Sequence, residues 1–248
     1  MLYYQIRQKN QIIFFGHRGA PKIRHENTIS SICKSIELGC HGVEIDIQKT
    51  KDNKIILFHD DFIISNSKKY FINQLEYQHI SQLCQFNNIP QPDPIEDLVN
   101  IIKNHPKIIF NIEIKSKSLN NRKTLNYILK HIPQRILLHQ CIISSFNYFL
   151  LCQLRHTFFY KGKTALILDN TPFNNQLVLQ IKKTFILILN PDFLHINFKQ
   201  TTGSFINWAH KKSIFINTYT INDKTSLERC ISLGVDGVFT DNHQLYNK

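Results

Sequence analysis

The sequence predicts an α/β barrel, in which a closed ring of parallel strands is covered by helices. Short apolar runs typical of strands alternate with helical segments along the chain, as they do in parallel sheets. The runs are rich in Ile, Leu, Val and Phe on both faces, which is typical of strands buried on both sides. The length of 248 residues is that of one such barrel.

Nine strand-like runs and seven helical stretches are expected, with no repeat, low-complexity run or linker among them. The strand-like runs are 12–15, 43–47, 55–58, 108–114, 141–144, 165–168, 185–189, 214–218 and 237–240. The helical stretches are 27–38, 95–104, 121–131, 148–155, 176–183, 203–211 and 224–233. A barrel of eight strands therefore leaves one run over.

The connection between runs 43–47 and 55–58 identifies the extra strand. Only about seven residues intervene, with the turn signal Asp52-Asn53, whereas a parallel crossover needs a dozen or more. Run 55–58 should therefore return antiparallel beside 43–47, which brings His59 back to the level of Asp46. Residues 61–94 then form a small insertion in the single domain of residues 1–248. The insertion either caps the barrel or is a solvent-facing loop with a short helix near 77–85.

Composition excludes several classes of protein. The formal net charge is +12, which suits an anionic substrate but also reflects a chain rich in Lys, Ile and Asn. The Lys and Arg residues are dispersed and not interleaved with aromatics, which disfavours nucleic-acid binding. No apolar window is long enough to span a membrane, and the start of the chain lacks a secretory signal pattern. The six cysteines form no Cys-x-x-Cys pair, so reduced thiols and a cytoplasmic location are expected.

Three carboxylates at strand ends predict a metal site. Glu44 and Asp46 are two residues apart on a strand, so their side chains share one face. Glu113 lies near the end of a later strand. Carboxylates brought together repel one another unless a cation lies between them. Three oxygen ligands without thiols or clustered imidazoles favour Ca²⁺ or Mg²⁺ over zinc.

His17 and His59 are the candidate general acid and base. Each follows a strand-like run at the level of the carboxylates, and imidazole titrates near neutral pH. The other ten histidines, such as His79, His105 and His195, are expected to be structural or exposed.

The remaining candidates would bind substrate or support the site. Arg18 can bind a phosphate through two N–H groups and Lys115 adds a point charge. Tyr219 would line the substrate pocket, or simply pack. Glu26 and Asn27 open the first helix; Glu26 would orient Arg18, and Asn27 would either support the site or cap the helix.

These residues together resemble the glycerophosphodiester phosphodiesterase family. The likeness runs from Ile12 to Asp241, nearly the whole chain. It comprises seven motifs in family order: His-Arg-Gly-Ala at 17–20, Glu-Asn-Thr at 26–28, the run from Gly42 to Asp52 leading to His59-Asp60, Glu-Ile-Lys at 113–115, Ser145-Phe146, Thr-Ile-Asn at 220–222, and Gly-Val-Asp-Gly at 234–237 with Thr240-Asp241.

The resemblance implies a TIM (β/α)8 barrel of the phospholipase-C-like phosphodiesterase type with its site at the carboxyl ends of the strands. It implies metal-dependent hydrolysis of small anionic glycerophosphodiesters to glycerol 3-phosphate and an alcohol. By motif position Glu44, Asp46 and Glu113 would hold one divalent cation, Ca²⁺ or Mg²⁺. His17 and His59 would be the acid/base pair, and Arg18 and Lys115 would hold the phosphate.

The chain departs from the family pattern at three peripheral places. It has His25 where Pro usually precedes Glu-Asn-Thr, Tyr219 where Trp usually stands, and Asn242-His243 where a Pro commonly follows Thr-Asp. The Tyr219 difference affects the expected pocket wall, so it leaves the head group open. The short insertion resembles that of the cytosolic bacterial members.

Two rival functions stay open. A lysophospholipase D acting on lysolipids would need an apolar lip, for which the insertion offers Phe62, Ile63, Ile64, Tyr70 and Phe71. A non-catalytic barrel that binds a phosphate ligand would keep the site without turnover. No nucleic-acid partner and no stable membrane insertion are expected, and a homodimer is one arrangement that the sequence allows.

Overall fold

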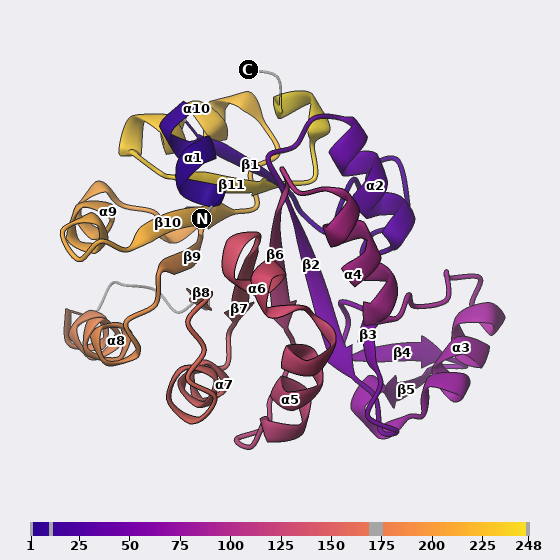
Figure 1. Cartoon of the computed structure of the whole chain (residues 1–248). Coiled ribbons are helices and arrows are strands. Elements are labelled where there is room, and N and C mark those ends of the chain that lie inside the picture. The colour runs from indigo at the N-terminus through magenta and orange to yellow at the C-terminus, as the bar shows by residue number, and fades with distance from the viewer. Residues whose placement is uncertain (1, 10–11, 169–175, 247–248) are drawn as a thin grey trace.

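A closed barrel of eight parallel strands, surrounded by helices, forms the body of the molecule (Figure 1). In this computed structural model, residues 2–9, 12–168 and 176–246 are described. Around the ring the strands follow the order β1-β11-β10-β9-β8-β7-β6-β2, and β1 pairs with β2 to close it. Their bounds are β1 Ile13–Gly16, β2 Gly42–Lys49, β6 Ile109–Ile114, β7 Cys141–Ser145, β8 Lys163–Ile167, β9 Phe193–Asn197, β10 Phe215–Tyr219 and β11 Gly237–Thr240. The predicted barrel is confirmed.

Helices cover the outside of the ring and pack on the outward-facing apolar residues of the strands. The helices of the described residues are α1 Leu2–Lys9, α2 Ile29–Glu37, α3 Tyr77–Phe86, α4 Ile95–Asn104, α5 Arg122–His131, α6 Gln134–His139, α7 Tyr148–Cys152, α8 Gln176–Leu189, α9 Gly203–His210 and α10 Lys224–Leu233. On β2, Val43, Ile45 and Ile47 join this outer core, so the alternate residues Glu44 and Asp46 face the barrel interior.

The expected hairpin is present. Strand β3 (Ile55–Leu57) pairs antiparallel with the upper half of β2, in the register Ile47↔Leu57, while the lower half of β2 pairs with β1. The insertion that follows carries a second hairpin, β4 (Phe62–Ser65) and β5 (Lys68–Phe71), and helix α3. It lies beside β3 at the side of the barrel (Figure 1). A short helix near 77–85 was expected, whereas the hairpin was not.

One predicted strand is wrong. Run 185–189 belongs to α8, where Ile186 and Leu189 are buried while Phe185 and Ile188 are about half exposed. This spacing of three is that of a helix that buries one face. The strand that takes its place in the ring is β9, which was not predicted because His195 and Asn197 interrupt its apolar character.

Helix α1, also unexpected, closes the amino-terminal end of the barrel. Tyr3 is fully buried and packs against Phe15, Phe193 and Phe215. Its hydroxyl donates a hydrogen bond of 3.0 Å to the Oδ1 atom of Asn217 inside the barrel. Because this end is filled by aromatic side chains, the open end of the barrel is the one at the carboxyl ends of the strands.

Candidate active site

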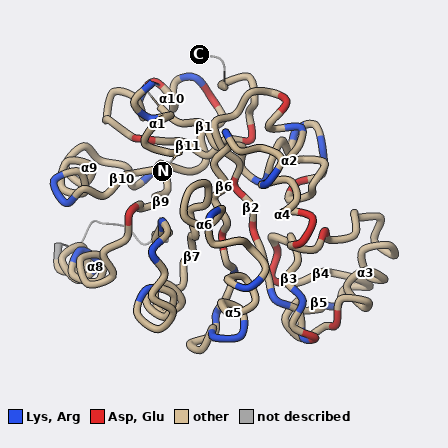
Figure 2. Tube along the Cα trace, viewed as in Figure 1, with Lys and Arg blue, Asp and Glu red and all other residues tan. Residues whose placement is uncertain are grey.

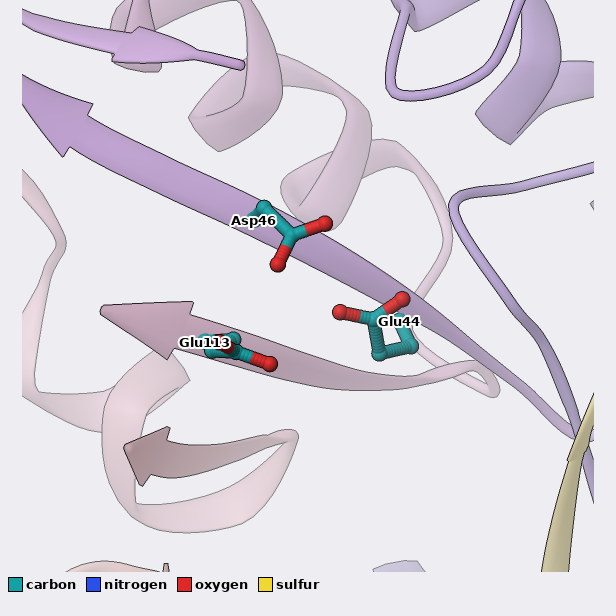
Figure 3. Close-up of side chains that lie close together, drawn as sticks. All are labelled: Glu44, Asp46 and Glu113. Atoms are coloured by element: carbon teal, nitrogen blue, oxygen red, sulfur yellow. The ribbon is translucent and has the colours of Figure 1, made fainter. Parts of the chain in front are cut away.

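The three predicted metal ligands meet inside the barrel. Glu44 and Asp46 come from β2, and Glu113 comes from the neighbouring strand β6, where it is the register partner of Asp46. One carboxylate oxygen of each lies within 4.8 Å of the others, and all three residues are buried (Figure 3). The three carboxylate groups lie close together between β2 and β6, as the strand spacing predicted.

This arrangement is electrostatically unfavourable when all three carboxylates are charged. Burial raises the pKa of Glu44 well above its ordinary value, and the neighbouring charges of Asp46 and Glu113 raise it further. Burial and the charge of Asp46 also raise the pKa of Glu113, to about 7. Asp46 Oδ2 is buried and accepts no hydrogen bond from the described residues. Oxygen ligands of this kind fit a hard divalent cation.

Two basic side chains flank the carboxylates. Lys115 Nζ lies 3.1 Å from Asp46 Oδ1 and 3.0 Å from Glu113 Oε1. Burial alone would lower the pKa of Lys115, but these two carboxylates hold it above its ordinary value. Arg18 Nε lies 3.5 Å from Asp46 Oδ2, and its Nη1 donates a hydrogen bond of 2.8 Å to Glu26 Oε1. The predicted contact between Glu26 and Arg18 is thus present in the structure.

The turn after β1 places Arg18. Arg18 and Gly19 both adopt positive φ angles, of 54° and 88°. The backbone N–H of Arg18 donates a hydrogen bond of 2.9 Å to Glu44 Oε2. A Cβ at position 19 would lie 2.5 Å from the backbone of Ser31, so glycine is needed there. The turn therefore ties the arginine to the first carboxylate.

His17 is held by a carboxylate from the last strand. Its Nδ1 lies 2.7 Å from Asp241 Oδ1, and its Nε2 lies 4.0 Å from Glu44 Oε2. Burial tends to raise the pKa of Asp241, but the hydrogen bond and charge of His17 lower it overall. An ionised Asp241 accepts a hydrogen bond from the Nδ1–H group, which fixes the ring with Nε2 on the side of Glu44.

His59 is bonded on both ring nitrogens. Its Nδ1 lies 2.7 Å from Asp60 Oδ1, and its Nε2 lies 2.8 Å from Arg18 Nη2. Burial is the main cause that lowers the pKa of His59. The charge of Asp46 raises this pKa, whereas the charges of Lys115 and Arg18 lower it further. Because a guanidinium only donates, the Nε2 atom of His59 accepts and the ring is neutral in this arrangement.

Two amide side chains hold the segments that carry these groups. The side chain of Asn27 donates to the backbone oxygen of Asp46 and accepts from its backbone N–H, at 2.8 and 2.9 Å. Asn27 thus supports Asp46, while Thr28 caps helix α2. Gln48 Nε2 donates to the backbone oxygens of residues 58, 59 and 60, at 2.7 to 3.1 Å. Gln48, which was not predicted, fixes the turn that carries His59.

All eight predicted catalytic, phosphate-binding, pocket and metal residues line one pocket of about 260 Å³. They are His17, Arg18, Glu44, Asp46, His59, Glu113, Lys115 and Tyr219. The Tyr219 hydroxyl donates a hydrogen bond of 2.7 Å to the backbone oxygen of Leu168, so this side chain forms a fixed wall.

The pocket is also lined by residues that were not predicted as site residues, among them Asn111 and His195. Asn111 lies two residues before Glu113 on β6. Its Nδ2 donates to Ser144 Oγ, and its buried Oδ1 has no hydrogen-bond partner among the described residues. His195 is buried, and its Nε2 lies 3.3 Å from Asn217 Nδ2. Burial lowers the pKa of His195 to about 3. His195 is therefore neutral at physiological pH, and its position in the pocket floor was not expected.

Comparison with known proteins identifies the family. The profile of the glycerophosphoryl diester phosphodiesterase family matches residues 17–245. The chain belongs to this family. The identification from sequence motifs is confirmed, and with it the expectation of an enzyme.

Relatives match over nearly their whole length. An uncharacterised protein of Bacillus subtilis is 26% identical over 92% of this chain and 93% of its own. A glycerophosphodiester phosphodiesterase of Caldanaerobacter subterraneus is 25% identical over the same shares of the two chains.

Solved structures share the fold. A putative glycerophosphoryl diester phosphodiesterase from Silicibacter pomeroyi superposes with a TM-score of 0.80 at 16% identity, over 95% of this chain and 91% of that one. A phosphodiesterase from Oleispira antarctica, in complex with sn-glycerol 3-phosphate, superposes with a TM-score of 0.77 at 20% identity and covers 94% of each chain. In the described part of the present chain no helix is long and apolar enough to cross a membrane.

Proposed function

We propose that this protein hydrolyses glycerophosphodiesters to glycerol 3-phosphate and an alcohol, with a divalent cation held by Glu44, Asp46 and Glu113. The observation that carries the proposal is one pocket lined by these carboxylates, two histidines, Arg18 and Lys115. The names of the relatives and the glycerol 3-phosphate bound to the Oleispira protein support it.

The carboxylate cluster fits a hard cation such as Ca²⁺ or Mg²⁺. A cation bound there would offset the repulsion among the buried carboxylates, withdraw charge from a phosphate oxygen and lower the pKa of the attacking oxygen. Arg18 and Lys115, on either side of Asp46, would bind the remaining phosphate oxygens and stabilise the charge that develops on them. Both basic groups are already held in place by the carboxylates.

His17 would act as the general base. Because Asp241 holds the Nδ1–H group, the neutral form of the ring would carry its lone pair on Nε2, on the side of Glu44. In the proposed step Nε2 accepts the proton of the attacking water or glycerol hydroxyl as the new bond to phosphorus forms. Attack by the glycerol hydroxyl would give a cyclic phosphate, which a water molecule would then open to glycerol 3-phosphate.

His59 would act as the general acid. Its Nε2 now accepts a hydrogen bond from Arg18, so it can carry a proton only after that contact opens. If the hydrogen bond from Arg18 Nη2 moves to the substrate phosphate, His59 Nε2 would be free to take up a proton from solvent water. His59 would then give this proton to the alcohol oxygen as its bond to phosphorus breaks.

Product analysis with two substrates tests the proposal. Protein supplied with Ca²⁺ or Mg²⁺ is incubated with glycerophosphocholine and with lysophosphatidylcholine, and the phosphorus-containing products are identified by ³¹P NMR. We expect glycerol 3-phosphate from the first substrate. Exclusive formation of lysophosphatidic acid from the second would instead support a lysophospholipase D. Cation-dependent thermal stabilisation without any turnover would support a binding protein.

Two variants test the roles of the histidines. Removal of either side chain, in His17→Ala or His59→Ala, should lower kcat by about 10²- to 10⁴-fold. His139→Ala, which removes an exposed histidine at the end of α6, is the matched control and should keep the wild-type rate. A His59→Ala variant that retains the wild-type rate would exclude His59 as the acid.

A further inference from the structure

A second, larger cavity of about 960 Å³ adjoins the catalytic pocket, and Lys115 lines both of them. One wall is the loop between β6 and α5 together with the start of α5. The other is the insertion, through Asp61, Phe71 and the 3-10 helix η1 (Ile72–Gln74). An ion pair between Lys117 and Asp61 joins the two walls. We call this cavity the outer groove.

The outer groove is much more basic than the chain as a whole. Its charged lining residues are Lys49, Lys115, Lys117, Arg122, Lys123 and one acid, Asp61. The ratio of basic to acidic residues is five to one in the groove, whereas the chain as a whole has 30 basic and 18 acidic residues. Figure 2 shows basic segments along α5 and beside β3, on the two sides of this region.

Two of these cations are free to bind a ligand. Arg122 and Lys123, the first two residues of α5, are exposed, and their side chains make no ion pair with the described residues. By contrast, Lys115 is engaged by Asp46 and Glu113, and Lys117 by Asp61. The rest of the lining is mostly amide and hydroxyl groups, including Asn73, which hydrogen-bond well to a polyol.

The position of Lys115 relates the groove to the proposed reaction. Lys115 would hold the substrate phosphate, and the smaller pocket extends inward from it to Asn111 and His195. With the glycerol part in this inner pocket, the alcohol part on the other side of the phosphate would extend into the outer groove. The groove therefore faces the leaving alcohol.

We propose that the outer groove selects glycerophosphodiesters whose alcohol is a phosphorylated polyol, with Arg122 and Lys123 binding its second phosphate. This inference rests on the proposed function and names its preferred substrate class. An alcohol with a quaternary ammonium group is disfavoured, because the groove would place a positive charge among five basic side chains and one acid. Binding of a second phosphate by exposed cations is screened by salt.

Three substrates separate the contributions of charge and hydroxyl groups. They are glycerophosphoinositol 4-phosphate, glycerophosphoinositol and glycerophosphocholine, compared by kcat/KM with the same divalent cation. We expect the phosphorylated substrate to be preferred over glycerophosphocholine by about tenfold or more at low salt, from two or more exposed charge pairs. The preference should shrink in about 0.5 M NaCl.

The double variant Arg122→Ala/Lys123→Ala tests the assigned residues. It should lower the ratio of kcat/KM for the phosphorylated substrate to that for glycerophosphocholine by about tenfold. The matched control is Lys211→Ala/Lys212→Ala, which removes two exposed lysines from the turn between α9 and β10, at the opposite end of the barrel. Because this control removes the same amount of positive charge far from the groove, an unchanged ratio of the two kcat/KM values would exclude an effect of net charge.

The outcomes distinguish this inference from the proposed function. Cleavage of glycerophosphocholine with no preference for the phosphorylated substrate would overturn the inference and leave the proposed function in place. A preference that survives in Arg122→Ala/Lys123→Ala would overturn the assignment of these residues. No cleavage of any of the three substrates would contradict the proposed function, and the inference would fail with it.

Discussion

The buried histidine in the pocket floor makes stability depend on pH. His195 is fully buried, and burial lowers its pKa from 6.5 to about 3. The unfolded chain therefore binds a proton at this residue below about pH 6.5, whereas the folded protein does not until about pH 3. The contribution of neutral His195 to stability is fully present above about pH 6.5 and is lost progressively as the pH falls from about 6.5 to about 3.

The size of the effect follows from the two pKa values. A shift of one pKa unit corresponds to about 1.4 kcal/mol. For these values, the free energy of unfolding should fall by about 2 kcal/mol between about pH 7 and about pH 5 because of His195 alone. In a His195→Gln variant this loss should be absent, since glutamine does not titrate and can keep a hydrogen bond to Asn217.

Urea denaturation of both proteins at several pH values measures this difference. The wild type should lose about 2 kcal/mol more than His195→Gln over this interval. The control His139→Gln, at an exposed position, should behave as the wild type does. Equal pH slopes for the wild type and His195→Gln would refute the reasoning, because His195 would then be accessible to protons in the folded state.

Three further outcomes are expected. Asp241→Asn should lower kcat by about 10²-fold or more with little change in KM, because His17 loses the carboxylate that holds its Nδ1 proton; an unchanged kcat would contradict that role. Gly19→Ala should destabilise the protein by at least ~1 kcal/mol, given the positive φ and the short contact with Ser31, and a Tm equal to that of the wild type would argue against the turn described. Tyr3→Ala should lower the free energy of unfolding by about 3–5 kcal/mol, measured by urea denaturation. A loss below about 1 kcal/mol would contradict the packing of Tyr3 in the barrel end.

Local patterns in the sequence predict most of the barrel. Alternation of apolar runs and helical stretches identifies seven of the eight barrel strands, and a short connection shows that β3 lies outside the ring. The error at α8 arose because Phe-Ile-Leu-Ile-Leu is apolar at every position, so its period cannot be recognised. Strand β9 was not predicted because the polar residue His195 is buried at a position where an apolar residue is expected.

Candidate site residues are predictable when residues of distinctive chemistry share one face of a strand. Glu44 and Asp46 are examples, since two residues of separation on a strand suffices to place them together. The pairing of His17 with Asp241 depends instead on β1 lying beside β11, in the register Gly16↔Thr240. Predicting ring closure would have placed these two side chains together. Gln48 gave no such signal, because its role depends on backbone oxygens of the following turn.

Glycerol 3-phosphate release from glycerophosphocholine is the most direct test of the proposed activity. The protein is treated with a chelator, assayed, and assayed again after Ca²⁺ or Mg²⁺ is added back, beside a Glu44→Gln variant that keeps a similar shape. We predict that release disappears on chelation, returns with one of the cations, and stays absent in Glu44→Gln. Release that persists in the chelated protein, or a fully active Glu44→Gln variant, would contradict a cation-dependent reaction at the three carboxylates.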